Sequence, residues 1–504
     1  MNIFVRIRRS NQVRMKIPEF NFRLTNFLLA VLLFGCLFLT ATLLDFNGLY
    51  GQDAHEYLRL TRALSIFFYD GTAISHSYFP ILYPLAAFLI SKIVWNDIAA
   101  MQLVSIIALV ASFFYLKKLL QLIHSQATLL NGYLVAFFFL SPYVFRFGLL
   151  AMSDMLCSFF VLAAVYHALS YSKLPAVKHS VLCGLFAAFA ISTRYAVILL
   201  VLFPSFILLR AILINKDFKA IVFTLFAFCC VLIPDLLIRD RILFLDTGSE
   251  SFSIDYAANA YAWSPVNFFR NTFQNPDGNQ HYDFWNIVAV TFNIIHPAYL
   301  FIGAVLIFFL KRNDFAPPSM KLLLIMVIVY GFFIAGLNYQ NNRYLLQSFP
   351  FLLVIFYPAF SRMVKRYFFK PGMQQVFYAM IILSQLVLFW YSFQKIRLLN
   401  DTEREIASSL KPYAGQTVYT CSIVGALSSY EVNNPVVDLY FTPITHPAPN
   451  SLVIFNYPEF SRYYAGRTPM YNWNVLNDQA PLRIVRSFPN GWALYTVEQQ
   501  PAVP

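Results

Sequence analysis

Residues 78–95, YFPILYPLAAFLISKIVW, decide the fold of this chain. The stretch is apolar enough to span a membrane, but it contains Pro80, Pro84 and Lys92, and a proline inside a helix removes a hydrogen bond and clashes with the preceding turn. If the stretch crosses a bilayer, every later loop changes sides. Composition and the positions of the charges decide between the two topologies.

The composition excludes a soluble globular protein. Of the 504 residues, 59% are hydrophobic and 12% are charged, and the mean hydropathy is +0.59, which leaves too little polar surface for contact with water. The net charge of +13 comes from short basic clusters at the ends of apolar runs. This pattern is typical of cytoplasmic loops and not of a nucleic-acid surface. All cysteines except Cys421 lie in or at the edge of apolar runs, so no disulfide framework is predicted.

Long apolar runs predict about eleven transmembrane helices, because a span needs about 20 residues. The first run follows a basic N-terminus, residues 1–23, and is too long for a signal peptide and without a small-residue cleavage site. The bundle then occupies residues 24–393. The predicted spans are residues 24–44, 98–122, 128–147, 154–172, 179–194, 196–214, 219–238, 286–310, 319–338, 344–361 and 374–393.

The basic clusters favour the topology in which residues 78–95 do not cross the membrane. In that case every cluster shares the cytoplasmic side with the N-terminus, whereas a crossing would translocate all of them, against the positive-inside rule. We therefore predict that residues 78–95 lie along or dip into the outer interface. The outer parts are then a first loop, 45–97, a large loop, 239–285, and a C-terminal domain, 394–504. The clusters are Lys117/Lys118, Lys173/Lys178, Lys216/Lys219, Lys311/Arg312/Lys321 and Arg362/Lys365/Arg366/Lys370.

The first outer loop contains a predicted amphipathic helix that starts near Asp53. Its apolar residues fall mainly on one stripe, which favours a helix at the membrane surface. Asp53 and Glu56 also have the spacing of a capping box. That structural role alone explains both acids, but it is compatible with chemistry, since a capping carboxylate is well positioned and exposed. The stripe contains Tyr57, Leu58, Ala63, Leu64, Phe67 and Phe68.

An ordered set of motifs resembles a known superfamily. An acid soon after the first span is followed by the amphipathic helix, by YFPILYPLAAFL at 78–89 and by a second span; further pieces are AMSDM at 151–155, ISTRY at 191–195 and NRYLLQSFP at 342–350. The order resembles that of the C-type glycosyltransferases, particularly the branch of protein O-mannosyltransferases and bacterial lipid A aminoarabinose transferases. The resemblance covers roughly residues 20–395 and rests on order and topology.

The resemblance implies transfer of a hexosyl or pentosyl group from a polyprenyl-phosphate carrier to an acceptor on the outer face, with an acid in the first loop as catalytic base. The matching residue is Asp53. A carboxylate there would accept the proton of an acceptor hydroxyl as that oxygen attacks the anomeric carbon and the phosphate departs, and a single displacement would invert that carbon. The mannosyltransferases have a Glu after this Asp, whereas this chain has Ala54, which argues against mannosylation of protein Ser or Thr.

Two arginines are candidates for binding the departing phosphate, which needs positive charge. Arg194 lies between two apolar runs and Arg343 precedes a span. An ionisable residue between apolar runs is usually functional or paired, and the planar fork of arginine suits phosphate. The alternative for Arg343 is a snorkelling arginine at the interface.

Two acids complete the predicted substrate-binding residues. Asp154 begins the fourth span and Glu56 lies in the first loop. Asp53 and Asp154 are also possible ligands of a divalent metal, so a metal cofactor stays open, and the alternative for Asp154 is a helix N-cap. His55 beside these acids does not make the ligand set of a zinc site.

The C-terminal domain is predicted to be mixed α/β. A helix is expected at 403–411, and a Pro-Asn-Gly sequence at 489–491 predicts a hairpin turn. Acceptor recognition and simple support are both open as roles for this domain, and the aromatic loop 239–285 either covers the site or forms an interfacial belt. The predicted strands are 417–424, 436–440, 451–457, 483–488 and 492–497.

Two other functions stay open. A transporter or flippase for lipid-linked glycans would be expected to have internal repeats and acids at the membrane midplane, which the sequence lacks apart from Asp235 near the end of a span. A noncatalytic scaffold leaves the outer acids and Arg194 unexplained. The expected location is a bacterial inner (plasma) membrane, and the acceptor is a glycan, a lipid or a protein.

Overall fold

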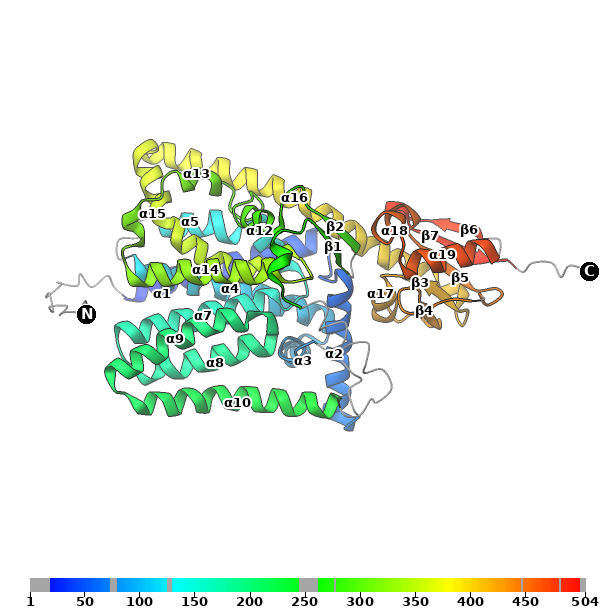
Figure 1. Cartoon of the computed structure of the whole chain (residues 1–504), viewed down its shortest axis with the longest axis horizontal. Coiled ribbons are helices and arrows are strands. Elements are labelled where there is room, and N and C mark those ends of the chain that lie inside the picture. Colours follow the sequence, from blue (N-terminus) through cyan, green and yellow to red (C-terminus); the bar gives the residue numbers. More distant parts are fainter. Residues whose placement is uncertain are drawn as a thin grey trace, which may run out of the picture.

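The computed structural model describes residues 19–72, 79–124, 129–243, 262–275, 278–445, 447–479 and 482–498. A bundle of helices runs along the long axis, and a small mixed domain lies at one end of it (Figure 1). The predicted basic N-terminus up to residue 18, and residues 244–261 of the predicted loop 239–285, lie outside the described residues.

Most of the predicted spans are single long helices. Seven described helices are long and apolar enough to cross a membrane, so the chain is an integral, multi-pass membrane protein. They are α1 (Glu19–Leu43), α4 (Asp97–Ile123), α7 (Asp154–Lys173), α9 (Ile198–Asn215), α10 (Phe218–Leu243), α14 (Pro318–Gly336) and α16 (Pro371–Ser409).

The remaining predicted spans differ from this simple form. The 128–147 run is a pair of helices bent by 68° that makes up to one more span, and the 286–310 run is broken because Pro297 cannot continue a helix and disfavours helical backbone at His296. Among the described residues, seven helices are long and apolar enough to cross a membrane, or eight spans if the bent pair counts as one. The sequence predicted eleven. The elements concerned are α5 (Leu130–Leu134), η1 (Val135–Phe139), α6 (Pro142–Leu149), α8 (Val177–Thr193), α12 (Asn286–Ile294), α13 (Gly303–Ile307) and α15 (Phe349–Tyr367).

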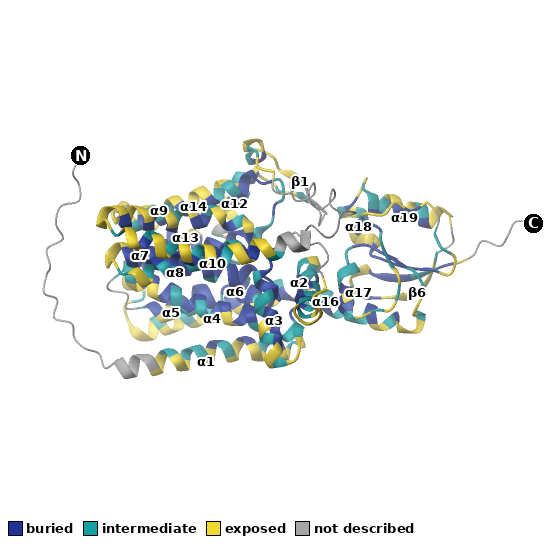
Figure 2. Ribbon diagram, turned by 90° about the horizontal axis from the view of Figure 1, so that it is seen from below, coloured by how far each residue is buried: buried dark blue, intermediate teal, exposed yellow. Residues whose placement is uncertain are grey.

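Burial separates a central helix from helices at the rim of the bundle. In the 18-residue apolar stretch of each helix, 83% of the residues of α7 are buried, against 17% in α1 and 11% in α10. Helix α7 packs against α4, α8 and α9, whereas α1 exposes apolar side chains such as Phe27 and Leu32 along its length (Figure 2). Exposed apolar surface of this extent suits contact with lipid rather than water.

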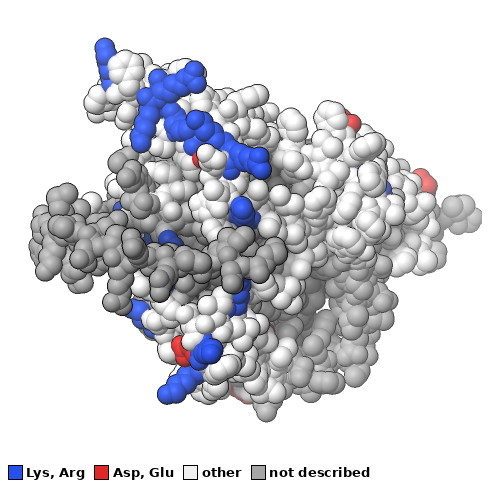
Figure 3. Space-filling model, turned by 60° about the vertical axis from the view of Figure 1, so that its left-hand side comes forward, with Lys and Arg blue, Asp and Glu red and all other residues white. Residues whose placement is uncertain are grey.

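Residues 79–95 contain no helix as long as a membrane span. Helix α3 (Leu82–Val94) has 13 residues, or about 20 Å at 1.5 Å per residue, short of a hydrocarbon core of about 30 Å. It packs against α4 and against α2 (Gly51–Asp70), which lies across the ends of the bundle helices beside the C-terminal domain (Figure 1). The predicted basic clusters consequently gather at the other end of the bundle, where Figure 3 shows Lys and Arg side chains together.

Helix α16 joins the bundle to the C-terminal domain without interruption. It runs from Pro371 to Ser409, so it passes through the predicted boundary at residue 394 and includes most of the helix predicted at 403–411. Polar residues follow the apolar part of the run, but several of them, such as Lys395, Arg397 and Glu403, are good helix formers, and the change in hydropathy does not end the helix.

The C-terminal domain is a five-stranded mixed sheet in the order β4-β3-β5-β7-β6. Strand β3 is parallel to β4 and β5, and β7 is antiparallel to β5 and β6. Each strand falls on a predicted one, and the predicted turn at 489–491 joins β6 to β7. The elements are β3 (Val418–Thr420), α17 (Val424–Ser429), β4 (Val436–Asp438), β5 (Leu452–Phe455), α18 (Tyr457–Tyr463), α19 (Thr468–Gln479), β6 (Leu482–Ser487) and β7 (Ala493–Val497).

Candidate active site

The segment between α1 and α2 places the start of α2 against the bundle. Gly48 has a φ of +93°, and its carbonyl accepts a hydrogen bond from the backbone N–H of Ala151 at 2.8 Å. A Cβ on Gly48 would lie 3.3 Å from the Cβ atoms of Ala151 and Gln102. The left-handed backbone and the close approach both favour glycine here. The segment therefore runs beside the junction between α6 and α7, where Asp154 begins α7.

Asp53 lies in the first turn of α2, not at its cap. The helix begins at Gly51 and Tyr50 occupies the N-cap position, so the predicted capping box with Asp53 as the cap does not form. A carboxylate in the first turn still interacts favourably with the helix dipole. Glu56 pairs with Arg59 at 2.7 Å, and Phe68 of the predicted apolar stripe is 52% exposed.

Asp53 is paired with Arg343. The Nη1 atom of Arg343 lies 2.5 Å from Oδ2 of Asp53, and the side chains are 14% and 19% exposed. Arg343 lies in η5 (Asn342–Gln347), a 3₁₀ turn before α15. Burial acts to lower the pKa of Arg343, but Asp53 and Asp154 raise it well above its usual value, so the guanidinium stays charged. Its Nε atom is buried without a hydrogen-bond partner in the part of the chain that the structure describes.

A second, more deeply buried pair joins Asp154 to Arg194. The Nη1 atom of Arg194 lies 2.8 Å from Oδ1 of Asp154, and the side chains are 8% and 1% exposed. Ser153 occupies the N-cap position of α7 and Asp154 is its first residue, while Arg194 lies between α8 and the turn η2 (Tyr195–Val197). Asp154 is thus an ion-pair partner rather than an N-cap. Its Oδ2 atom is buried and has no hydrogen-bond partner among the described residues.

Two tyrosines lie beside the pairs, and sequence reasoning missed both. The Tyr57 hydroxyl lies 2.7 Å from Oγ of Ser153, and the Tyr344 ring lies 5.4 Å from the guanidinium carbon of Arg194 and 5.8 Å from that of Arg343. Burial raises the pKa of the Tyr57 phenol, so it stays protonated. Tyr57 looked like part of an apolar stripe, but it lies four residues after Asp53, on the same helical face.

The structure therefore brings Asp53, Asp154, Arg194 and Arg343 to the same end of the bundle. Glu56 lies one turn along α2 and contacts Arg59 instead. The described residues contain no group of three or more His, Cys, Asp and Glu side chains that could hold a metal ion. Asp53 and Asp154 are each engaged by an arginine, so they do not fit a metal site as they stand. A metal stays a prediction, and we derive no step through one.

Solved structures share this architecture. No protein-family model and no curated protein matches the sequence. ArnT from Cupriavidus metallidurans, an aminoarabinose transferase, matches in its form bound to undecaprenyl phosphate with a TM-score of 0.59 and 11% identity over 94% of this chain and 98% of that chain. The apo form matches with a TM-score of 0.59 and 10% identity over 95% and 98%. The chain has the C-type glycosyltransferase fold.

The C-type glycosyltransferase fold confirms the resemblance inferred from the order of the sequence motifs. An oligosaccharyltransferase from Archaeoglobus fulgidus is also similar, with a TM-score of 0.44 and 12% identity over 90% of this chain and 68% of that chain. The low identities explain why topology and motif order, rather than any single motif, pointed to this fold.

Proposed function

We propose that the chain is a membrane glycosyltransferase that takes a sugar from a polyprenyl-phosphate carrier and transfers it to an acceptor on the extracytoplasmic face of a bacterial inner membrane. The observation on which the proposal rests is the Asp53–Arg343 pair beside the Asp154–Arg194 pair, at the end of the bundle where the C-terminal domain lies. The binding of undecaprenyl phosphate by ArnT, which has the same fold, supports a carrier of this chemical class.

Asp53 is the proposed general base. As the hydroxyl oxygen of a glycan, lipid or protein acceptor forms a bond to the anomeric carbon, its proton moves to Asp53. The bond between that carbon and the phosphate oxygen breaks, and polyprenyl phosphate leaves with the electron pair. Asp53 contacts Arg343 through Oδ2, so we assign the proton to Oδ1. One displacement inverts the anomeric carbon.

The arginines are the proposed phosphate ligands. A departing phosphate develops negative charge, and fixed cations in a site of low polarity stabilise it strongly. Arg343 has an Nε donor without a partner among the described side chains, so it can contact phosphate while Nη1 pairs with Asp53. Asp154 fixes the guanidinium of Arg194, and Glu56, three residues after Asp53, is proposed to accept hydrogen bonds from the sugar.

A panel of purified polyprenyl-phosphate sugars tests the proposal. The purified protein is incubated with each donor and an acceptor extract from a bacterial envelope, and released polyprenyl phosphate is measured. We expect one donor to be consumed with stoichiometric release of polyprenyl phosphate. Consumption of no donor with any extract would overturn the proposal. Movement of an intact lipid-linked glycan across vesicles without that release would favour a flippase.

A further inference from the structure

The C-terminal domain contacts the same turn of α2 that contains Asp53. His55 is 3% exposed, and its Nδ1 atom lies 2.9 Å from Oγ of Ser429 in α17. Its Nε2 atom lies 3.3 Å from Oε2 of Glu403 in α16. Glu403 is 2% exposed and Ser429 is 6% exposed. An imidazole with its proton on Nε2 satisfies both contacts, because it donates to Glu403 and accepts from the Ser429 hydroxyl.

Asp53 and His55 lie on nearly opposite sides of α2. Residues two positions apart in an α-helix are separated by about 200° around its axis. Asp53 therefore contacts Arg343 of the bundle while His55 contacts Glu403 and Ser429. The first turns of α2 are held from both sides, and a shift of the C-terminal domain would move Asp53.

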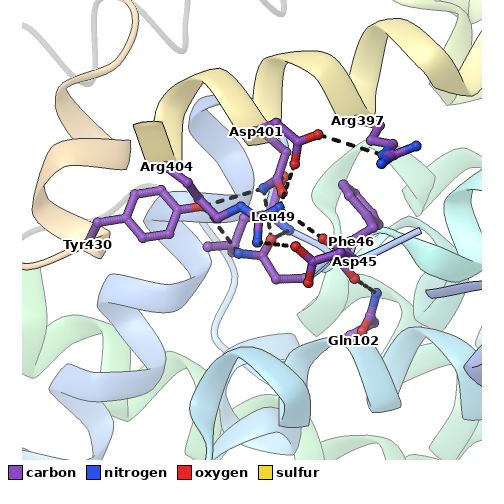
Figure 4. Close-up of polar contacts among 10 residues, drawn as sticks. Asp45, Phe46, Leu49, Gln102, Arg397, Asp401, Arg404 and Tyr430 are labelled. Carbon is purple, nitrogen blue, oxygen red and sulfur yellow. Dashed lines mark hydrogen bonds and ion pairs between the residues drawn. The ribbon is translucent and has the colours of Figure 1, made fainter. Parts of the chain in front are cut away.

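The segment before α2 is bound to the same partners. The Nδ2 atom of Asn400 donates to Oδ1 of Asn47 at 2.8 Å and to the carbonyl of Leu49 at 3.0 Å. Arg404 pairs with Asp45 at 3.0 Å (Figure 4). Tyr430, which follows α17, accepts a hydrogen bond from Asn47 at 3.2 Å. Both the approach to α2 and its first turns are thus attached to α16 and α17.

Helices α17 and α2 also pack closely at Gly425. A Cβ on Gly425 would lie 2.9 Å from Cβ of His55 and 3.3 Å from Oε1 of Gln52. No side chain fits there without a shift of one helix. Glu403 and Asn400 lie on the unbroken helix α16, so this contact is continuous with the bundle.

We propose that His55, Glu403 and Ser429, here called the His55 clamp, are positioning residues through which the C-terminal domain holds Asp53 in its reactive place. The inference rests on the proposed function and assigns a role to the C-terminal domain. Burying an imidazole and a carboxylate stabilises a fold less than apolar side chains of the same size. What the clamp adds is a fixed geometry, and misplacement of a reacting group by about 1 Å can cost about 100-fold in rate.

The test uses the donor that the wild-type protein consumes. Glu403→Met removes the acceptor for His55, and Glu403→Gln restores a carbonyl oxygen at the same place. Gly425→Ala pushes α17 from α2 without removing a polar group. Gly372→Ala is the matched control, because a Cβ there meets no atom within 4 Å. We expect Glu403→Met and Gly425→Ala to lower kcat about 10-fold to 100-fold with an unchanged KM for the donor, and Glu403→Gln to recover most of the loss.

Hydrogen exchange gives a second readout that does not need turnover. We expect amides in the first turns of α2 to exchange faster in Glu403→Met and Gly425→Ala, and amides of α7 to be unchanged. Wild-type kcat in both variants, or α2 exchange equal to that of Gly372→Ala, would overturn the clamp. An equal loss of kcat in Glu403→Gln and Glu403→Met would also overturn it. Absence of turnover in the wild-type protein would instead overturn the proposed function, and the exchange result would still decide the clamp.

Discussion

At the scale of single residues, the two acid–arginine pairs differ in burial and therefore in what their removal costs. Asp154 and Arg194 are nearly inaccessible, whereas Asp53 and Arg343 keep some exposure. Burial of an ion pair costs the desolvation free energy of both charges, so the intact pair adds little stability. Removal of one partner is strongly destabilising, because the other charge is left buried and unpaired. We therefore expect the deeper pair to contribute more to stability and the less buried pair to be more accessible to substrate.

Asp154→Ala is expected to lower the free energy of unfolding by about 3–5 kcal/mol, because it leaves the Arg194 guanidinium buried without its anion. Thermal unfolding in detergent measures the effect. The double variant Asp154→Leu with Arg194→Met serves as the control and should recover most of the loss, since no charge is left unpaired. A single variant as stable as the wild-type protein would contradict this view of the pair.

Arg343→Lys keeps the charge but loses the planar fork and the Nε donor. We expect kcat/KM for the donor to fall about 10-fold to 100-fold, in line with about 1.5–3 kcal/mol for a hydrogen bond to a charged group. Arg483→Lys, at a side chain that is 72% exposed in the C-terminal domain, should leave kcat/KM unchanged. Steady-state kinetics with both variants measures these values. An equal kcat/KM for Arg343→Lys and Arg483→Lys would contradict the assignment of Arg343 to the site.

Sequence reasoning singled out the charged residues of the candidate site but not the uncharged ones. Asp53, Asp154, Arg194 and Arg343 stand out because ionisable groups are rare near apolar runs. Ser153 and Tyr344 do not stand out, because hydroxyl and aromatic side chains are common at helix ends and in membrane interfaces. Their roles depend on contacts between distant segments, which no local pattern contains.

At the scale of helices, local pattern predicted where spans lie but not how they bend or end. The prolines and Lys92 of residues 78–95 predicted that this stretch does not cross, and α3 within it has only 13 residues. The break after α12 follows from Pro297, yet the average hydropathy of 286–310 masked it. The continuation of α16 beyond residue 393 was missed because hydropathy reports lipid contact, whereas helix propensity decides whether the backbone continues.

Close helix packing in the bundle depends on Gly184. A Cβ there would lie 2.6 Å from the carbonyl oxygen of Thr224 in α10, so Gly184→Ala must separate α8 from α10. We expect a loss of about 1–3 kcal/mol in stability, as for other overpacked sites. Gly331→Ala in α14, where a Cβ meets no atom within 4 Å, should be neutral or stabilising by up to about 1 kcal/mol. Thermal unfolding in detergent compares them, and equal stabilities would contradict the packing.

At the scale of the whole molecule, the basic end and the C-terminal domain lie at opposite ends of the bundle (Figures 1 and 3). The positive-inside rule predicts that the basic end lies in the cytoplasm and that the proposed active site lies outside. In a variant without native cysteines, we expect Tyr471→Cys in the C-terminal domain to react with an impermeant maleimide in intact cells, and Lys216→Cys to react only after lysis. The reverse pattern would invert the proposed orientation.

The central claim is that Asp53 is the base of a sugar-transfer reaction. Asp53→Asn and Asp70→Asn make the same chemical change at the two ends of α2, and Asp70 is exposed. Release of polyprenyl phosphate from the consumed donor should fall at least about 100-fold in Asp53→Asn, the loss typical of a missing general base. It should stay at the wild-type rate in Asp70→Asn. Wild-type release by folded Asp53→Asn protein would contradict the account.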